Sequence, residues 1–264
     1  MKEILLCEPR HYALEYEINP WMKLENQPQM DLAQSQWRTL QNQLLSEGVK
    51  LSFLEPQTGV PDLVFTANGA LIHQGEAVLS RFRYRERQRE EPHFQQWLLE
   101  RQFTLHRLPE GQCFEGEGDA LFWAGDLIAG YGFRSDLDSH QWIAKLWGLH
   151  CISLCLVDPR FYHLDTCFCP LNDHLALYYP PAFDSYAQRA LQGLDRELIA
   201  VNEADALAFC CNALVLGNRV ILQHCSRELK ALLQSYGFDL VQLDFSEFMK
   251  AGGSAKCLSL TLQG

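Results

Sequence analysis

The chain has 264 residues, with 22 lysines and arginines against 33 aspartates and glutamates, and a formal net charge of −11. This acidic balance argues against a nucleic-acid-binding protein, which needs a basic face for phosphates. Hydrophobic residues make up 47% of the chain, as in ordinary globular proteins. No uncharged apolar stretch reaches the ~18 to 20 residues that a membrane span requires.

The ten cysteines do not predict a secreted scaffold held by disulfides. Most of them lie within apolar runs, as in Cys151–Cys155 and the pair Cys210 and Cys211. The apolar stretch Ile4–Cys7 is too short for the core of a signal peptide. We therefore expect reduced cysteines in a cytoplasmic protein.

Segments typical of strands alternate with segments typical of helices along the whole chain. In chain order, the expected strands and hairpins are Ile4–Cys7, Leu51–Leu54, Leu63–Phe65 with Ala77–Leu79, Gly118–Phe122 with Leu127–Gly130, Cys151–Val157, Thr166–Cys169 with Leu175–Tyr179, Ala213–Leu216 with Val220–Leu222, and Leu240–Leu243. The expected helices are Asp31–Ser46, Pro92–Arg101, Ser139–Trp147, Ala182–Leu194 and Ser226–Tyr236. The recurring unit is a hairpin followed by a helix and a strand.

This unit returns at a nearly constant period. Residues near the successive hairpin openings, 47 to 49 positions apart, are Phe65, Phe114, His163, Cys210 and Cys257. A fixed period indicates repeated supersecondary units that share one core. Five openings predict a closed ring in a single domain over residues 1–264, with the N-terminal segment completing the last unit. The alternative is an ordinary α/β protein in which the period is accidental.

In a ring of repeats the hairpin openings converge on one axis, and here they carry reactive side chains. They bring together an amide, a carboxylate, an imidazole with a carboxylate, and a thiol: Asn68, Glu115, His163 with Asp165, and Cys257. A cysteine nucleophile needs a partner that handles protons and a group that orients it. Neighbouring carboxylates raise the pKa of a thiol, so their presence makes sense if the substrate brings a positive charge.

Each of these residues also has a purely structural interpretation. His163 lies between Tyr162 and Leu164 and fits a buried core histidine. The stretch Phe114–Asp119 fits an acidic turn, and Cys257 is one of ten cysteines, although the glycines before it favour close approach of a ligand. Cys167 and Cys169 lack a second ligand pair at zinc spacing, so we expect no metal.

Five motifs in order resemble those of the guanidine-modifying amidinotransferase superfamily, which includes arginine deiminases, dimethylarginine dimethylaminohydrolases, glycine amidinotransferases and arginine dihydrolases. The motifs are Phe65–Asn68, Phe114–Asp119, Gly130–Arg134, His163–Asp165 and Gly252–Cys257. The resemblance extends from the N-terminal strand to Cys257. It implies an α/β fold, the five-bladed pseudo-symmetric α/β propeller known as the pentein fold, which agrees with the period.

The resemblance also implies roles for the central residues. Cys257 would attack the guanidinium carbon, and His163 would protonate the departing nitrogen and then activate water. Glu115 would hold the guanidinium nitrogens, with Asp165 adding to that hold. No cofactor is expected, and the partner is a small guanidino compound rather than a nucleic acid or a membrane.

Other charged residues are expected to bind the rest of the substrate. Arg134, in the stretch that begins at Gly130, resembles the arginine that pairs with the substrate α-carboxylate, where a bidentate pair gives affinity and orientation. In the basic run between Arg81 and Arg89, Arg81 or Arg85 would help to seat the same carboxylate; the alternative is a solvated loop. Asp119 is either structural or in contact with the substrate.

Two amides separate the subfamilies. Where deiminases and dimethylaminohydrolases carry an aspartate, this chain has Asn68, and Asn19 supplies a second amide near the N-terminus. Both features resemble arginine dihydrolases. An amide suits that reaction, because it can bind the charged guanidinium and the neutral ureido intermediate alike. The sequence thus predicts an arginine dihydrolase. The alternatives are an arginine deiminase, a dimethylarginine dimethylaminohydrolase, an amidinotransferase, and a non-catalytic sensor that binds arginine.

Overall fold

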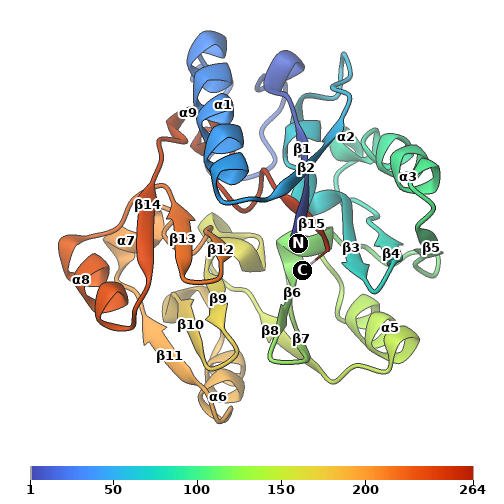
Figure 1. Ribbon diagram of the computed structural model, residues 1–264. Coiled ribbons are helices and arrows are strands. Elements are labelled where there is room, and N and C mark those ends of the chain that lie inside the picture. The colour runs from blue at the N-terminus through green and yellow to red at the C-terminus, as the bar shows by residue number, and fades with distance from the viewer. Residues whose placement is uncertain (1, 264) are drawn as a thin grey trace.

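Five three-stranded sheets surround a common axis in the computed structural model, which describes residues 2–263 (Figure 1). The sheets, each with its strands in spatial order, are β15 (Leu260–Gln263), β1 (Glu3–Cys7) and β2 (Lys50–Leu54); β3 (Ala70–His73), β4 (Glu76–Leu79) and β5 (Thr104–Arg107); β6 (Ala120–Trp123), β7 (Asp126–Tyr131) and β8 (Cys151–Cys155); β9 (Phe168–Asn172), β10 (Leu175–Tyr178) and β11 (Glu197–Ala200); and β12 (Leu214–Leu216), β13 (Arg219–Leu222) and β14 (Asp239–Gln242).

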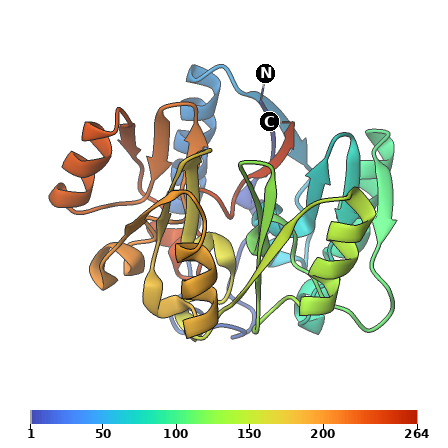
Figure 2. The same ribbon diagram turned by 90° about the horizontal axis from the view of Figure 1, so that it is seen from below.

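All five sheets share one topology. The first two strands form an antiparallel pair, and the third strand lies parallel to the second. A parallel pair needs a crossover connection, which is helical in each unit. The crossover helices are α1 (Met30–Ser46), α3 (Glu91–Glu100), α5 (Leu137–Trp147), α6 (Ser185–Gln192) and α8 (Arg227–Ser235). Figures 1 and 2 show these helices on the outside of the ring.

The two ends of the chain close the ring. Strand β15 pairs antiparallel with β1, with Leu260 opposite Leu5, so the first sheet contains both ends of the described chain. The predicted closure by the N-terminal segment is confirmed. The fold is the predicted five-bladed α/β propeller.

Strand β1 shows how neighbouring blades share a core. All of its residues are buried, and successive side chains of a strand point to opposite faces. Ile4 and Leu6 pack in the cluster that contains Trp37 of α1, whereas Leu5 packs with Phe94 of α3. The first blade therefore contributes apolar groups to both of its sides.

The predicted strand over Leu63–Phe65 is wrong. Pro61–Val64 and Thr66–Gly69 are 3₁₀ turns, and the first hairpin strand begins only at Ala70. Gly69 has to be a glycine there, because an added Cβ would lie 2.3 Å from the ring of Phe94. The predicted strand start at Gly118 is likewise too early, since the one-turn helix α4 (Gly116–Asp119) precedes β6. Apolar burial without regular periodicity explains the first error, whereas the second lies in the polar turn Gly-Glu-Gly-Asp, which contains no apolar run.

Three further short helices, α2 (Arg85–Gln88), α7 (Glu203–Leu207) and α9 (Ser246–Met249), complete the elements that concern the site. The expected helix over Ala182–Leu194 begins later, at Ser185, because the Asp184 side chain caps it by accepting from Ala187 N at 2.7 Å. Within residues 2–263, no helix has the length and apolar character needed to cross a membrane.

Candidate active site

Short helical turns place polar side chains on the axis of the ring. The turn Thr66–Gly69 precedes β3 and carries Asn68, Glu115 stands directly before α4, and the turn Leu164–Thr166 before β9 carries Asp165 with His163 at its start. All of these side chains are buried, as is Cys257. Buried polar groups need partners, and here they find one another.

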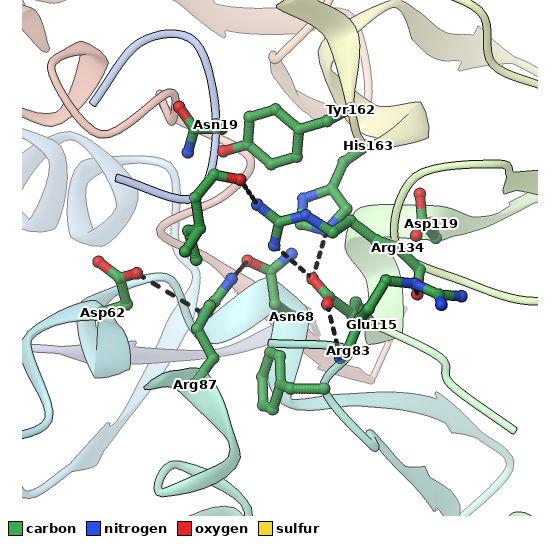
Figure 3. Close-up of polar contacts among 12 residues, drawn as sticks. Asn19, Asp62, Asn68, Arg83, Arg87, Glu115, Asp119, Arg134, Tyr162 and His163 are labelled. Atoms are coloured by element: carbon green, nitrogen blue, oxygen red, sulfur yellow. Dashed lines mark hydrogen bonds and ion pairs between the residues drawn. The ribbon is translucent and has the colours of Figure 1, made fainter. Parts of the chain in front are cut away.

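Glu115 is the centre of one half of this cluster (Figure 3). Its Oε2 atom lies 2.7 Å from Nε2 of His163 and accepts from Nη1 of Arg134 at 3.1 Å, while Oε1 accepts from the main-chain N–H of Arg83 at 3.2 Å. Burial by itself would raise the pKa of Glu115, but the charge of Arg134 and the hydrogen bond with His163 outweigh burial and lower it. Glu115 is therefore a carboxylate at neutral pH.

His163 is a neutral imidazole in the free protein. Burial lowers its pKa to about 4, although the contact with Glu115 acts in the opposite direction. Since the Glu115 carboxylate only accepts hydrogen bonds, Nε2 of His163 carries the proton. Nδ1 then has a free lone pair, and it faces Gly118, where an added Cβ would lie 3.3 Å from it. The ring is thus oriented by Glu115 and ready to exchange protons.

Cys257 forms the second half of the cluster with Asp165 and Asn212. The thiol donates to Oδ2 of Asp165 at 3.3 Å and accepts from Nδ2 of Asn212 at 3.1 Å. Burial raises the pKa of the Cys257 thiol well above its usual value, and the neighbouring Asp165 raises it further. Burial also raises the pKa of Asp165 to about 7 against the charge of Lys256. Without a cationic ligand, the thiol is protonated.

Asn68 and Arg87 form the wall beside these groups. Oδ1 of Asn68 accepts from Nη1 of Arg87 at 2.9 Å, whereas Nδ2 of Asn68 is buried and has no hydrogen-bond partner among the described residues. Gly118 leaves room for this amide, because an added Cβ would lie 2.1 Å from Nδ2. Glu90 holds Arg87 with two bonds, of 2.6 and 2.8 Å. An unpaired buried donor is costly, and this one belongs to a residue that lines a cavity.

A small cavity opens between these walls. Its lining residues are Ile18, Asn19, Met22, Asp62, Phe65, Asn68, Arg87, Arg134, Tyr162, Ala251, Gly252, Gly253 and Cys257. It has about 10 Å³ of free space, close to the least that can hold one water molecule. The side chains around it are closed on one another, so a larger ligand must displace some of them.

Arg134 and Asp62 carry the opposite charges of this lining. The Arg134 guanidinium lies between the rings of Tyr84 and Tyr162, 4.6 and 4.5 Å from their centres, and its Nη2 donates to the carbonyl of Ile18 at 3.1 Å. Asp62 accepts from the Tyr16 hydroxyl at 2.9 Å, but its Oδ1 atom has no hydrogen-bond partner among residues 2–263. Burial raises the pKa of Asp62, against the charge of Arg87.

The structure brings most of the predicted site residues together. Asn19, Asn68, Arg134 and Cys257 line the cavity; Glu115, His163 and Asp165 contact the lining directly or stand behind it. The amide of Asn19 is already occupied: Oδ1 accepts from the N–H of Trp21 and Met22, and Nδ2 donates to the carbonyl of Ala251 at 3.0 Å. It fixes the N-terminal segment over the site, and its contact with substrate stays a prediction.

Two predicted residues lie elsewhere. The guanidinium of Arg81 donates to the main-chain carbonyls of Leu108, Pro109 and Gln112, and it does not line the cavity. The arginine of the same basic run that does line it is Arg87.

Asp119 accepts from Ser135 Oγ at 2.6 Å and from Leu164 N at 3.1 Å. It thereby holds the backbone that follows His163, which fits the structural alternative.

Sequence reasoning missed three residues of this site. Arg87 was one of several arginines in a short run, and nothing local marked it as the one that turns inward. Asp62 stands in a mostly apolar stretch, and Asn212 follows two cysteines in another. A charged or amide side chain inside an apolar run was the one available signal, because such a group is buried only with partners.

This fold and this cluster define the class of protein as a member of the guanidine-modifying amidinotransferase superfamily. Within it, the family described as "N,N dimethylarginine dimethylhydrolase, eukaryotic" matches residues 12–263. The chain belongs to this dimethylarginine dimethylaminohydrolase family. The resemblance inferred from the five motifs is confirmed.

Two curated relatives of this chain have different activities. The bifunctional arginine dihydrolase/ornithine cyclodeaminase ArgZ of Synechocystis is 47% identical over 97% of this chain, which spans only 37% of that relative. The N(G),N(G)-dimethylarginine dimethylaminohydrolase of Mycobacterium tuberculosis is 42% identical over 97% of this chain and 84% of its own length.

Solved structures of the N-terminal domain of ArgZ are also similar to this chain. Its cysteine-to-serine mutant bound to substrate has a TM-score of 0.95 and 45% identity, over 100% of this chain and 98% of that one. Its asparagine-to-serine mutant, covalently bound to a reaction intermediate, has the same score, identity and coverage.

Proposed function

We propose that this chain hydrolyses the guanidinium group of arginine twice, as an arginine dihydrolase that releases ornithine, two ammonia molecules and CO2. The observation that carries the proposal is the buried Nδ2 atom of Asn68, which has no partner among the described residues and faces the ring of His163 across Gly118. The N–H donor at this position can bind the carbonyl oxygen of a neutral ureido group, which a carboxylate in its place could not do. The 47% identity with a dihydrolase supports the same conclusion.

The charges around the cavity match an amino acid with a guanidinium group. Arg87 and Arg134 can bind the α-carboxylate, since two guanidinium groups offer bidentate hydrogen bonds. The free Oδ1 atom of Asp62 and the carbonyl of Ile18 can accept from the α-ammonium. Glu115 and Asp165 then face the guanidinium at the far end, next to Cys257.

The substrate's own charge prepares the nucleophile. In the free protein burial and Asp165 keep the Cys257 thiol protonated. A guanidinium placed against Asp165 and Glu115 compensates their negative charge, and it favours the thiolate by direct attraction. In the first round the bound guanidinium thus favours formation of the Cys257 thiolate that attacks it.

The first round removes one ammonia. The thiolate attacks the guanidinium carbon, and the proton that the thiol released passes through His163 to the departing nitrogen. A thiouronium remains on Cys257. Water, deprotonated by His163, attacks the same carbon, the C–S bond breaks, and the ureido product stays in place. Glu115 stabilises the imidazolium that exists between these steps.

The second round repeats the attack on the ureido carbon. Ammonia leaves again, a thiocarbamate forms on Cys257, and hydrolysis gives a carbamate that loses CO2 to yield ornithine. The neutral ureido group needs a partner that does not require a cation. The Asn68 amide is such a partner, because it donates from Nδ2 and accepts at Oδ1.

The compartment that we propose for the reaction is the cytoplasm. All ten cysteines, each within residues 2–263, are free thiols in the structure. Free thiols in this number suit a reducing compartment.

The test is product analysis of the purified protein with L-arginine, by mass spectrometry with ammonia counted. We expect ornithine and two ammonia per arginine. Citrulline with one ammonia would make the protein a deiminase and would remove the argument from Asn68. Binding of arginine without turnover would favour the sensor.

Hydrolysis of dimethylarginine is the second candidate. The family match over residues 12–263 and the 42% identity with the mycobacterial enzyme favour it. Release of dimethylamine from N(G),N(G)-dimethylarginine, at a kcat/KM above that for arginine, would establish it. The two substrates should be assayed side by side on the same preparation.

A further inference from the structure

The Asn212 side chain uses both ends of its amide to link the turn before Cys257 with the backbone of Asp165. It lies between α7 and β12, with its side chain fully buried. Oδ1 accepts from the main-chain N–H of Ser254 at 3.1 Å and of Cys257 at 3.2 Å. Nδ2 donates to the carbonyl of Asp165 at 3.1 Å and to Sγ of Cys257 at 3.1 Å. An amide has two donors and room for two acceptor bonds, so none is left over.

The two ends of this amide act on different things. The oxygen binds main-chain N–H groups on either side of the turn that precedes the nucleophile, so it shapes that turn. The nitrogen points at the reacting sulfur itself. The hydrogen bond that Nδ2 donates to a neutral thiol is weak, but it becomes charge-assisted when the thiol ionises.

The backbone around Asn212 is built for this placement. Phe209 has φ of +58°, a conformation that bulky L-residues seldom adopt. The tight turn it makes is closed by Asn212 N donating to the Phe209 carbonyl at 3.0 Å. Phe209 is fully buried and packs edge-on against Trp21, with ring centres 4.8 Å apart. The strained turn is thus held by packing, as expected where a functional side chain must be fixed.

We propose that Asn212 is a positioning residue that orients Cys257 and stabilises its thiolate through Nδ2. The proposal rests on the function above only in taking Cys257 as the nucleophile. Asn212 does not line the cavity, so it acts on the sulfur and leaves substrate binding to other residues. Asp165 and Asn212 then have opposite effects at Sγ: the carboxylate accepts a hydrogen bond from the thiol and favours the protonated form, whereas the amide donates to Sγ and favours the thiolate.

The variant Asn212→Asp separates the two ends of the side chain. One carboxylate oxygen can still accept from Ser254 and Cys257, whereas the other replaces the N–H that faces Sγ and carries negative charge. Asn212→Ala removes both ends without adding charge. The control is Asn172→Asp, in an exposed turn where Oδ1 accepts from His174 N at 2.8 Å and an aspartate serves equally well.

The readout is the rate at which iodoacetamide alkylates Cys257, followed by peptide mass spectrometry because the chain has ten cysteines. No guanidino substrate takes part, so the result stands whether the enzyme is a dihydrolase, a deiminase or a dimethylaminohydrolase. A hydrogen bond to a charged group is worth roughly a ten- to hundredfold change in equilibrium. We expect alkylation at pH 8 to slow at least about tenfold in Asn212→Asp, less in Asn212→Ala, and not at all in Asn172→Asp.

A second readout is the split between kcat and KM on the substrate that the product analysis identifies. We expect kcat to fall with the alkylation rate and KM to stay within about threefold, given that Asn212 lies outside the cavity lining. Circular dichroism checks folding. The proposal is overturned if a folded variant is alkylated at the wild-type rate. It is equally overturned if both variants lose the folded state, since Asn212 would then be structural.

Discussion

Arg134 and Glu115 form an ion pair that is 98% or more shielded from solvent, with Nη1 of the arginine 3.1 Å from Oε2 of the glutamate. The same oxygen contacts His163. A substrate guanidinium that binds Glu115 therefore competes with the protein's own guanidinium. In the proposed function, substrate binding and release of Arg134 from Glu115 would be one event, which would free Arg134 for the substrate α-carboxylate.

The first prediction concerns this pair. Glu115→Gln should lower kcat at least ~100-fold and destabilise the fold by about 3–5 kcal/mol, because it leaves the Arg134 charge buried without its partner. The double variant Glu115→Gln with Arg134→Gln should recover much of the stability and none of the activity. Urea unfolding and steady-state kinetics measure the two effects. If the double variant is less stable than the single one, the pair is not the source of the loss.

The second prediction concerns Asn68. Asn68→Asp should move the products from ornithine toward citrulline, because a carboxylate favours the cationic guanidinium over the neutral ureido group. Its new charge would also pair with Arg87, which already donates to this side chain. Mass spectrometry of the products gives the ratio. An unchanged ratio of ornithine to citrulline would make the argument from the amide wrong.

The third prediction separates two arginines of one basic run. Arg87→Lys should raise KM for arginine roughly 10- to 100-fold, since lysine loses the bidentate geometry, and should leave the charge in place. Arg81→Lys is the matched control, because Arg81 bonds main-chain carbonyls outside the cavity. Initial rates over a range of arginine concentrations measure both. Equal KM changes in the two variants would speak against a carboxylate site at Arg87.

The fourth prediction concerns pH and stability at Asp165. Its folded-state pKa of about 7 lies above the ordinary value of 3.8, so the folded protein holds an extra proton between these pH values and stability falls as pH rises through that window. Asp165→Asn removes this dependence. We expect it to abolish turnover and to raise Tm by about 3–6 °C at pH 8, with little change at pH 4.

Calorimetric scans of both proteins at the two pH values make the measurement. A gain at pH 4 as large as that at pH 8 would show that the carboxylate is not ionised against burial. Retained turnover would remove Asp165 from the group of catalytic residues.

The repeat was readable from the sequence because five equivalent hairpins impose a period on the chain. The inner ends of those hairpins were harder to read. Leu63–Phe65 has strand-like composition but forms turns, since a buried irregular segment and a buried strand have the same apolar content. Strands β5 and β11 escaped notice because they are short and half-exposed, with no long apolar run.

The site residues also fall into a group that the sequence predicted and a group that it did not. Cys257, His163 and Glu115 stand in motifs whose order along the chain carries information. Arg87 and Asn212 act through positions that only the three-dimensional structure defines: one arginine among several turns inward, and one asparagine reaches a thiol 45 residues away in sequence. A local sequence pattern does not reveal a contact between residues of different blades.

Because β15 and β1 close the ring, the chain could begin and end in another blade without changing the order of the blades around the axis. The two ends of the described chain lie side by side in one antiparallel pair, with Leu5 opposite Leu260. A circular permutant that joins them and opens at the turn of Gly217 and Asn218 would keep every blade contact. In such a permutant Cys257, three residues before β15, would move from near the C-terminus to the interior of the chain. The position of the nucleophile is thus set by its place in the ring of blades and does not depend on its nearness to the C-terminus.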